Sequence, residues 1–176
     1  MTRTIDPLVE GHTRTMLGHA IRGEMDDLAT LIHAVGDAMY KQVIGLCVSA
    51  AEYITIDVCE RWPTDADLHE IARRVATKET AYELDEADVY NYLSKAALNY
   101  EPLEEALGHI EKAASLPVLI TASLLFRFRP QGQDQWNYLD QIWKAILEAE
   151  SLEAPVVPAV QNRAHREQIL KARSTE

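Results

Sequence analysis

Residues 39–58 read MYKQVIGLCVSAAEYITIDV and are apolar on nearly every side. The formal charges in this stretch are Lys41, Glu52 and Asp57. A helix of this composition can expose only a thin stripe to water, so other helices must surround it. Polar residues interrupt it before it reaches the roughly 18 uninterrupted apolar residues typical of a membrane span, so we expect no membrane partner. We predict that residues 39–61 form the buried central helix of an all-α, single-domain bundle of about six to eight helices.

Helix signals lie on both sides of this stretch. Pro7 can open a first helix, because its missing N–H costs nothing in the first turn. Apolar residues at three- and four-residue spacing predict a second helix over residues 25–35. Side chains that we expect to cap the N-termini of the central helix and of three later helices are Asp37, Thr64, Asp85 and Asp134.

Residues 117–128, PVLITASLLFRF, would suit a strand as well as a helix. We predict a helix, because the chain offers no second strand to pair with and an isolated strand would leave its backbone groups unpaired. The amino-acid composition changes after residue 150, where a Pro-containing segment precedes a short, mildly basic stretch. We therefore divide the chain into a helical bundle over residues 1–150 and a strap with a short C-terminal helix over residues 151–176.

Composition indicates a soluble globular domain of 176 residues with 47% apolar and 26% charged residues. The net charge of −11 repels phosphate backbones, so we expect no nucleic-acid partner. Cys47 and Cys59 lie twelve residues apart in one predicted helix, a separation of about 18 Å that prevents a disulfide between them. Unpaired apolar cysteines and an N-terminus without an apolar signal core predict a cytoplasmic protein.

Sequence motifs of nucleotide-binding loops and of serine hydrolases do not occur. The chain has no Gly-Lys-Ser/Thr phosphate loop, no Gly-x-Gly-x-x-Gly and no Gly-x-Ser-x-Gly. We therefore expect no cofactor and favour a non-catalytic protein, although these absences leave an enzyme of another kind open.

Histidines are the main candidates for metal ligands. His69 and His109 each follow a carboxylate by four residues, which places two ligand types on one helix face. Two ligands do not complete a site, but they keep a metal-dependent helical enzyme as one alternative. His12 and His19 share a face, yet two helical turns separate them by about 10 Å, too far for one ion.

The first functional hypothesis is a helical interaction or regulatory protein that binds a protein partner or self-associates. Gly11 and Gly18 recur at seven-residue spacing, which returns to almost the same helix face and allows another helix to approach closely. Ile169 and Leu170 are apolar residues of the C-terminal stretch and could reach a neighbouring subunit. We name these four residues as candidate interface positions.

The second hypothesis is a regulator that binds a small molecule or lipid in an apolar pocket between helices. The central helix and residues 117–128 would line the pocket. Tyr53, Arg127 and Trp143 are the candidate polar anchors of a ligand in this pocket.

Overall fold

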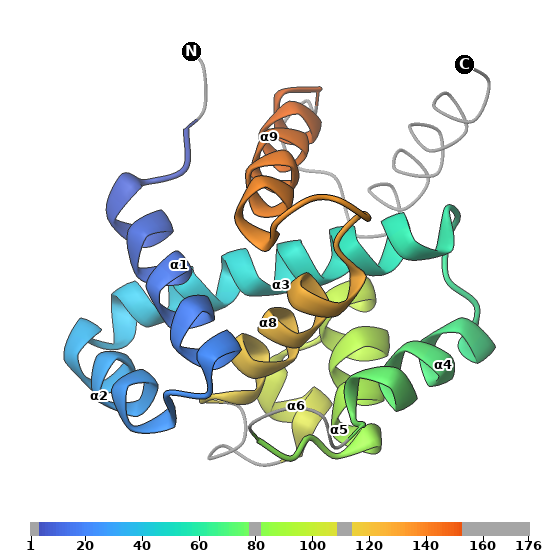
Figure 1. Ribbon diagram of the computed structural model, residues 1–176, viewed down its shortest axis with the longest axis horizontal. Helices are drawn as coiled ribbons and strands as arrows, with labels where there is room; N and C mark the ends of the chain where they lie inside the picture. The colour runs from blue at the N-terminus through green and yellow to red at the C-terminus, as the bar shows by residue number, and fades with distance from the viewer. Residues whose placement is uncertain (1–3, 78–81, 109–113, 153–176) are drawn as a thin grey trace.

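The computed structural model describes residues 4–77, 82–108 and 114–152, and within these ranges the chain is helical and contains no strand. The predicted all-α bundle is therefore confirmed (Figure 1). The helices are α1 (Pro7–Arg22), α2 (Met25–Val35), α3 (Asp37–Cys59), α4 (Asp65–Val75), α5 (Glu86–Asn91), the π-helix η1 (Tyr92–Ala97), α6 (Leu103–Leu107), α8 (Leu116–Phe128) and α9 (Gln135–Leu152).

Three of the four predicted N-caps are confirmed. The Asp85 and Asp134 carboxylates each accept bonds from two backbone N–H groups of the first helical turn. Thr64 forms a reciprocal capping box with Asp67, whose Oδ2 accepts from the Thr64 N–H at 2.7 Å. The prediction for Asp37 was wrong: Gly36 precedes α3 with φ +76° and ψ 157°, and this glycine-only conformation starts the helix without a side-chain cap.

A guanidinium reinforces the capping box at α4. Arg61 donates to both oxygens of Asp67, at 2.6 and 3.0 Å. These bonds, followed by those from Thr64, hold the pKa of Asp67 well below its usual range. The cap thus depends on an ionised, half-buried carboxylate in the first turn of α4.

The central position of α3 agrees with the prediction, although the helix runs from Asp37 to Cys59 and not over the predicted residues 39–61. Figure 1 shows α3 running across the molecule, with α1 crossing it, α8 below it and α9 above it, and all three contact it. Between Met39 and Val58 few residues are exposed, namely Lys41, Gln42, Gly45 and Asp57. Among the described helices, α3 is the one long and apolar enough to cross a membrane, and half of its most apolar window is buried inside the fold.

A second helix is buried more completely than α3. Every residue of α8 from Leu116 to Leu125 is buried, because α3, α1, α4 and α9 pack around it. Residues 117–128 lie within α8 and are helical, as predicted. A short helix that is mostly apolar and enclosed on all sides has no broad polar face, which explains why periodicity alone could not distinguish it from a strand.

The helix predicted after Asp85 is not a single α-helix. It changes from α5 into the π-helix η1 at Tyr92, whose ring is completely buried. A π-helix contains one more residue per hydrogen-bonded turn than an α-helix and shifts the following side chains around the axis. This segment places Tyr92, Leu93, Ala96 and Ala97 in the core.

A buried hydrogen-bond chain joins three of these helices. The Thr121 hydroxyl on α8 donates to the carbonyl oxygen of Cys47 on α3 at 3.1 Å. The Tyr92 hydroxyl on η1 lies 3.3 Å from the same Thr121 oxygen. Because the single Thr121 proton is used toward Cys47, Tyr92 must be the donor to Thr121. We call these three groups the polar node.

The end of α9 lies beyond the predicted end of the bundle. The helix continues to Leu152, two residues past the expected boundary at 150. The predicted strap and C-terminal helix, with Ile169 and Leu170, lie outside the described residues, so the division of the chain into two parts stays a prediction.

Candidate functional site

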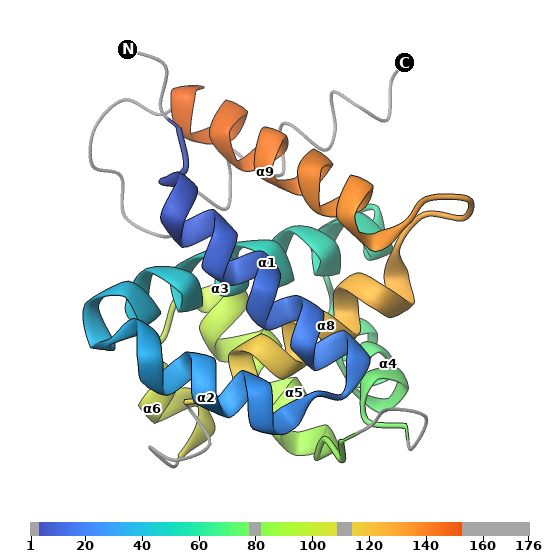
Figure 2. The same ribbon diagram turned by 60° about the vertical axis from the view of Figure 1, so that its left-hand side comes forward.

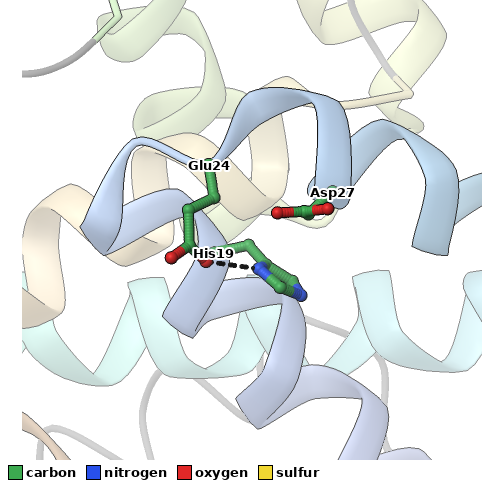
Figure 3. A group of neighbouring side chains, drawn as sticks. All are labelled: His19, Glu24 and Asp27. Atoms are coloured by element: carbon green, nitrogen blue, oxygen red, sulfur yellow. Dashed lines mark hydrogen bonds and ion pairs between the residues drawn. The ribbon is translucent and has the colours of Figure 1, made fainter.

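The turn between α1 and α2 brings together three side chains with metal-binding chemistry (Figure 3). His19 lies in the last turn of α1, Glu24 immediately precedes α2, and Asp27 lies in the first turn of α2. One ligand atom from each of these residues lies within 4.8 Å of the other two. We call this group the corner cluster; it is the one group of three such ligands among the described residues.

The backbone of the corner is held by a helix C-cap. Gly23 has φ +72° and ψ 21°, the left-handed conformation that glycine adopts without strain. Its N–H donates to the Ala20 carbonyl at 3.1 Å, and the Glu24 N–H donates to the His19 carbonyl at 2.9 Å. These two bonds form a Schellman motif, which reverses the chain and places Glu24 beside His19.

Charge is concentrated at this corner. The Glu24 carboxylate accepts from Arg22 Nε at 2.9 Å and Arg22 Nη2 at 2.7 Å, and lies 2.7 Å from His19 Nδ1. The hydrogen bonds from Arg22 and then from His19 lower the pKa of Glu24 to about 2. Glu24 is therefore a carboxylate at neutral pH, and the cluster ties the end of α1 to the start of α2.

Burial within the cluster is uneven. The His19 side chain is 19% exposed, the Arg22 side chain is 54% exposed, and Asp27 is exposed. The imidazole is thus largely enclosed, whereas the guanidinium that bonds to Glu24 lies at the surface.

The three predicted ligand anchors lie on different helices. Tyr53 on α3 and Arg127 on α8 are half-buried, and Trp143 on α9 is buried. Burial raises the pKa of Tyr138 and of Tyr82; Tyr53 adds to the rise at Tyr138, and Arg127 opposes the rise at Tyr82. The indole N–H of Trp143 is buried and has no hydrogen-bond partner among the described residues. These contacts do not test the predicted pocket, and it stays a prediction.

His69 makes a local contact on the outside of the bundle. Its ring stacks on Tyr90 with centroids 4.2 Å apart, and its Nε2 lies 3.7 Å from Asp65 Oδ2. The Tyr90 hydroxyl also donates to Asp65, so these three residues connect α4 to α5. His109, the other predicted metal ligand, lies outside the described residues.

The two predicted interface glycines have different surroundings. Gly11 is exposed, and a Cβ built there would have no neighbour within 4 Å. Gly18 is buried, and a Cβ there would lie 3.0 Å from Arg22 Nη1 and 3.7 Å from the Trp136 ring of α9. Close approach therefore occurs at Gly18, inside the bundle, and the interface role of both glycines stays a prediction.

Helices α2 and α3 follow one another along the chain at one side of the bundle (Figure 2). A half-buried apolar surface runs along α2 and the beginning of α3. Only Leu28 is buried among the residues of α2. The side chains that pack against the core with part of their surface still in solvent are Leu31, Ile32, Val35, Met39, Tyr40 and Ile44. We call these six residues the α2–α3 surface.

Sequence reasoning missed Glu24 and Asp27. It considered His19 only with His12, on the same helix, and did not consider the carboxylates that follow Gly23. The spacing His-x4-Glu-x2-Asp, with a glycine before the glutamate, was a usable signal, because a glycine C-cap folds the next residues back onto the helix end.

Comparison with known proteins gives no assignment. No family model matches the chain, and neither a curated protein nor a solved structure matches it.

Proposed function

We propose that this chain is a non-catalytic interaction protein that self-associates through the α2–α3 surface. The observation that supports the proposal is the incomplete burial of six apolar side chains on two consecutive helices. An amphipathic helix normally buries its apolar stripe, and contiguous exposed apolar surface often marks a protein contact.

The distribution of charge favours a second copy of this chain as the partner. Two copies that each carry a net charge of −11 repel one another over most of their surfaces. From Leu28 to Ala51, however, the sequence contains one carboxylate, Asp37, one lysine, Lys41, and one histidine, His33. In a symmetric contact through this nearly neutral region, few like charges face one another across the interface. Asp37 of each copy can also pair with Lys41 of the other copy.

Substitution at the edge of the surface tests the proposal without removing core contacts. Ala34 is exposed on α2, between Leu31 and Val35. Ala34→Arg would place a long charged side chain in the contact and leave the buried side of α2 unchanged. Ala66→Arg on α4 is the matched control, because Ala66 is also an exposed helical alanine and the change in net charge is the same.

Sedimentation velocity of the full chain over a concentration series measures the outcome. We expect a concentration-dependent dimer in the parent chain and in Ala66→Arg, and a monomer in Ala34→Arg. A general charge effect predicts the opposite for Ala34→Arg, because one added positive charge reduces repulsion between acidic copies. A parent chain that stays monomeric at all concentrations refutes the proposal, and a dimer unaffected by Ala34→Arg refutes the assigned surface.

A further inference from the structure

We propose that the corner cluster of His19, Glu24 and Asp27 binds one Zn²⁺ ion. This inference is independent of self-association, because it rests on donor atoms at the turn between α1 and α2 and not on the apolar surface beside it. Figure 3 shows the imidazole and the two carboxylates gathered at one side of this turn.

The donor set suits a borderline divalent ion. One imidazole nitrogen and two carboxylate oxygens are ligands that zinc accepts at about 2.0–2.2 Å, with water completing the coordination. Calcium requires six to eight oxygen ligands and does not match an imidazole-containing set of three. The cluster therefore selects for a transition metal by ligand type.

The ligand atoms are close to the spacing that coordination needs. Atoms bound to one zinc ion at about 2.1 Å are roughly 3–3.5 Å apart. His19 Nδ1 and Glu24 Oε2 are 2.7 Å apart, and all three ligand atoms lie within 4.8 Å of one another. Asp27 is exposed and can move toward the other two by side-chain rotation.

Arg22 competes with the proposed zinc ion for the Glu24 carboxylate. It donates two hydrogen bonds to Glu24, and zinc would replace this contact. The Arg22 side chain is 54% exposed, so it can turn into solvent, and exposed ion pairs of this kind contribute little to stability. On binding, Glu24 exchanges the guanidinium for the ion, and any proton on the ligating nitrogen of His19 passes to solvent.

Two matched pairs of variants separate this site from nonspecific uptake. Asp27→Asn is compared with Asp26→Asn, since both positions are exposed carboxylates in the first turn of α2. His19→Gln is compared with His33→Gln, since His33 is an exposed histidine in the last turn of α2. Within each pair, both substitutions change charge and residue type identically.

Isothermal titration of the chelator-treated full chain with ZnCl₂ measures the affinity, and circular dichroism confirms that each variant is folded. We expect one ion per chain, a loss of at least about tenfold in affinity for Asp27→Asn and His19→Gln, and parent-like affinity for the two controls. Arg22→Gln is expected to bind more tightly, because it removes the competitor for Glu24. The proposal is overturned if the chain takes up no zinc, if each variant and its control lose affinity equally, or if Arg22→Gln weakens binding.

Discussion

Replacing Thr121 with valine tests whether the polar node holds α3, η1 and α8 together. Thr121 and Tyr92 are completely buried, and their oxygens lie 3.3 Å apart. Valine has the shape of threonine but cannot accept a hydrogen bond, so the Tyr92 hydroxyl would be left without a partner. An unsatisfied buried donor costs about 1–3 kcal/mol, and we expect Thr121→Val to lower the free energy of unfolding by that amount.

A double-mutant cycle separates the hydrogen bond from simple changes in packing. Tyr92→Phe removes the donor but leaves the bond from Thr121 to Cys47, so it should cost about 1 kcal/mol. In the double variant no tyrosine hydroxyl is orphaned, and its total cost should be smaller than the sum of the single costs by about 1 kcal/mol.

Urea unfolding followed by circular dichroism gives these values. For a slope near 2 kcal/mol/M, Thr121→Val should lower the urea midpoint by about 0.5–1.5 M. All variants are compared at one protein concentration, because self-association would make stability concentration-dependent. Thr30→Val, at an exposed position on α2, is the control and should change stability by no more than about 0.5 kcal/mol. Strictly additive costs in the cycle would refute the assigned hydrogen bond.

Three further predictions concern a cap, two thiols and two glycines. Hydrogen bonds lower the folded-state pKa of Asp67. Its contribution to the stability of the folded chain is therefore fully present above the unfolded-state pKa of about 3.9 and is lost as the pH falls toward the folded-state pKa. Asp67→Asn should therefore make acid unfolding monitored by fluorescence less steep below about pH 4; an unchanged profile would contradict this role. Burial raises the pKa of the Cys47 thiol to about 12, so a thiol reagent at pH 8 should modify half-buried Cys59 first and Cys47 only in urea. Equal rates in the folded chain would show that Cys47 is accessible. Gly36→Ala should cost about 1–3 kcal/mol because of its positive φ. Gly45→Ala, at an exposed position inside α3 with open space around it, should stabilise by roughly 0.5–1 kcal/mol, and thermal unfolding of both variants compares them.

The helices could be predicted because their signals are local. The capping box at Thr64 spans three residues, and the apolar spacing of α2 repeats every three or four. The buried character of α3 was also readable, since a nearly uncharged segment has few positions to expose. Asp37 failed as a cap because the glycine before it adopts φ +76°, a choice that composition does not reveal.

The candidate site was only partly accessible to such reasoning. His19 was visible in the sequence, but its partners belong to the next helix and reach it only after the chain reverses at Gly23. The α2–α3 surface shows the same limit, because apolar spacing predicts a buried stripe and cannot tell how much of that stripe the rest of the fold covers.

The amino-acid sequence by itself determined where most of the helices lie and which segments are too apolar to face water, because caps and helical periodicity act over three or four neighbouring residues. Tertiary structure decided that α8 is enclosed, that η1 turns Tyr92 toward Thr121, and that α2 keeps apolar side chains partly in solvent. Each of these outcomes depends on packing between residues that are distant along the chain, and no local pattern encodes which helix will cover which face.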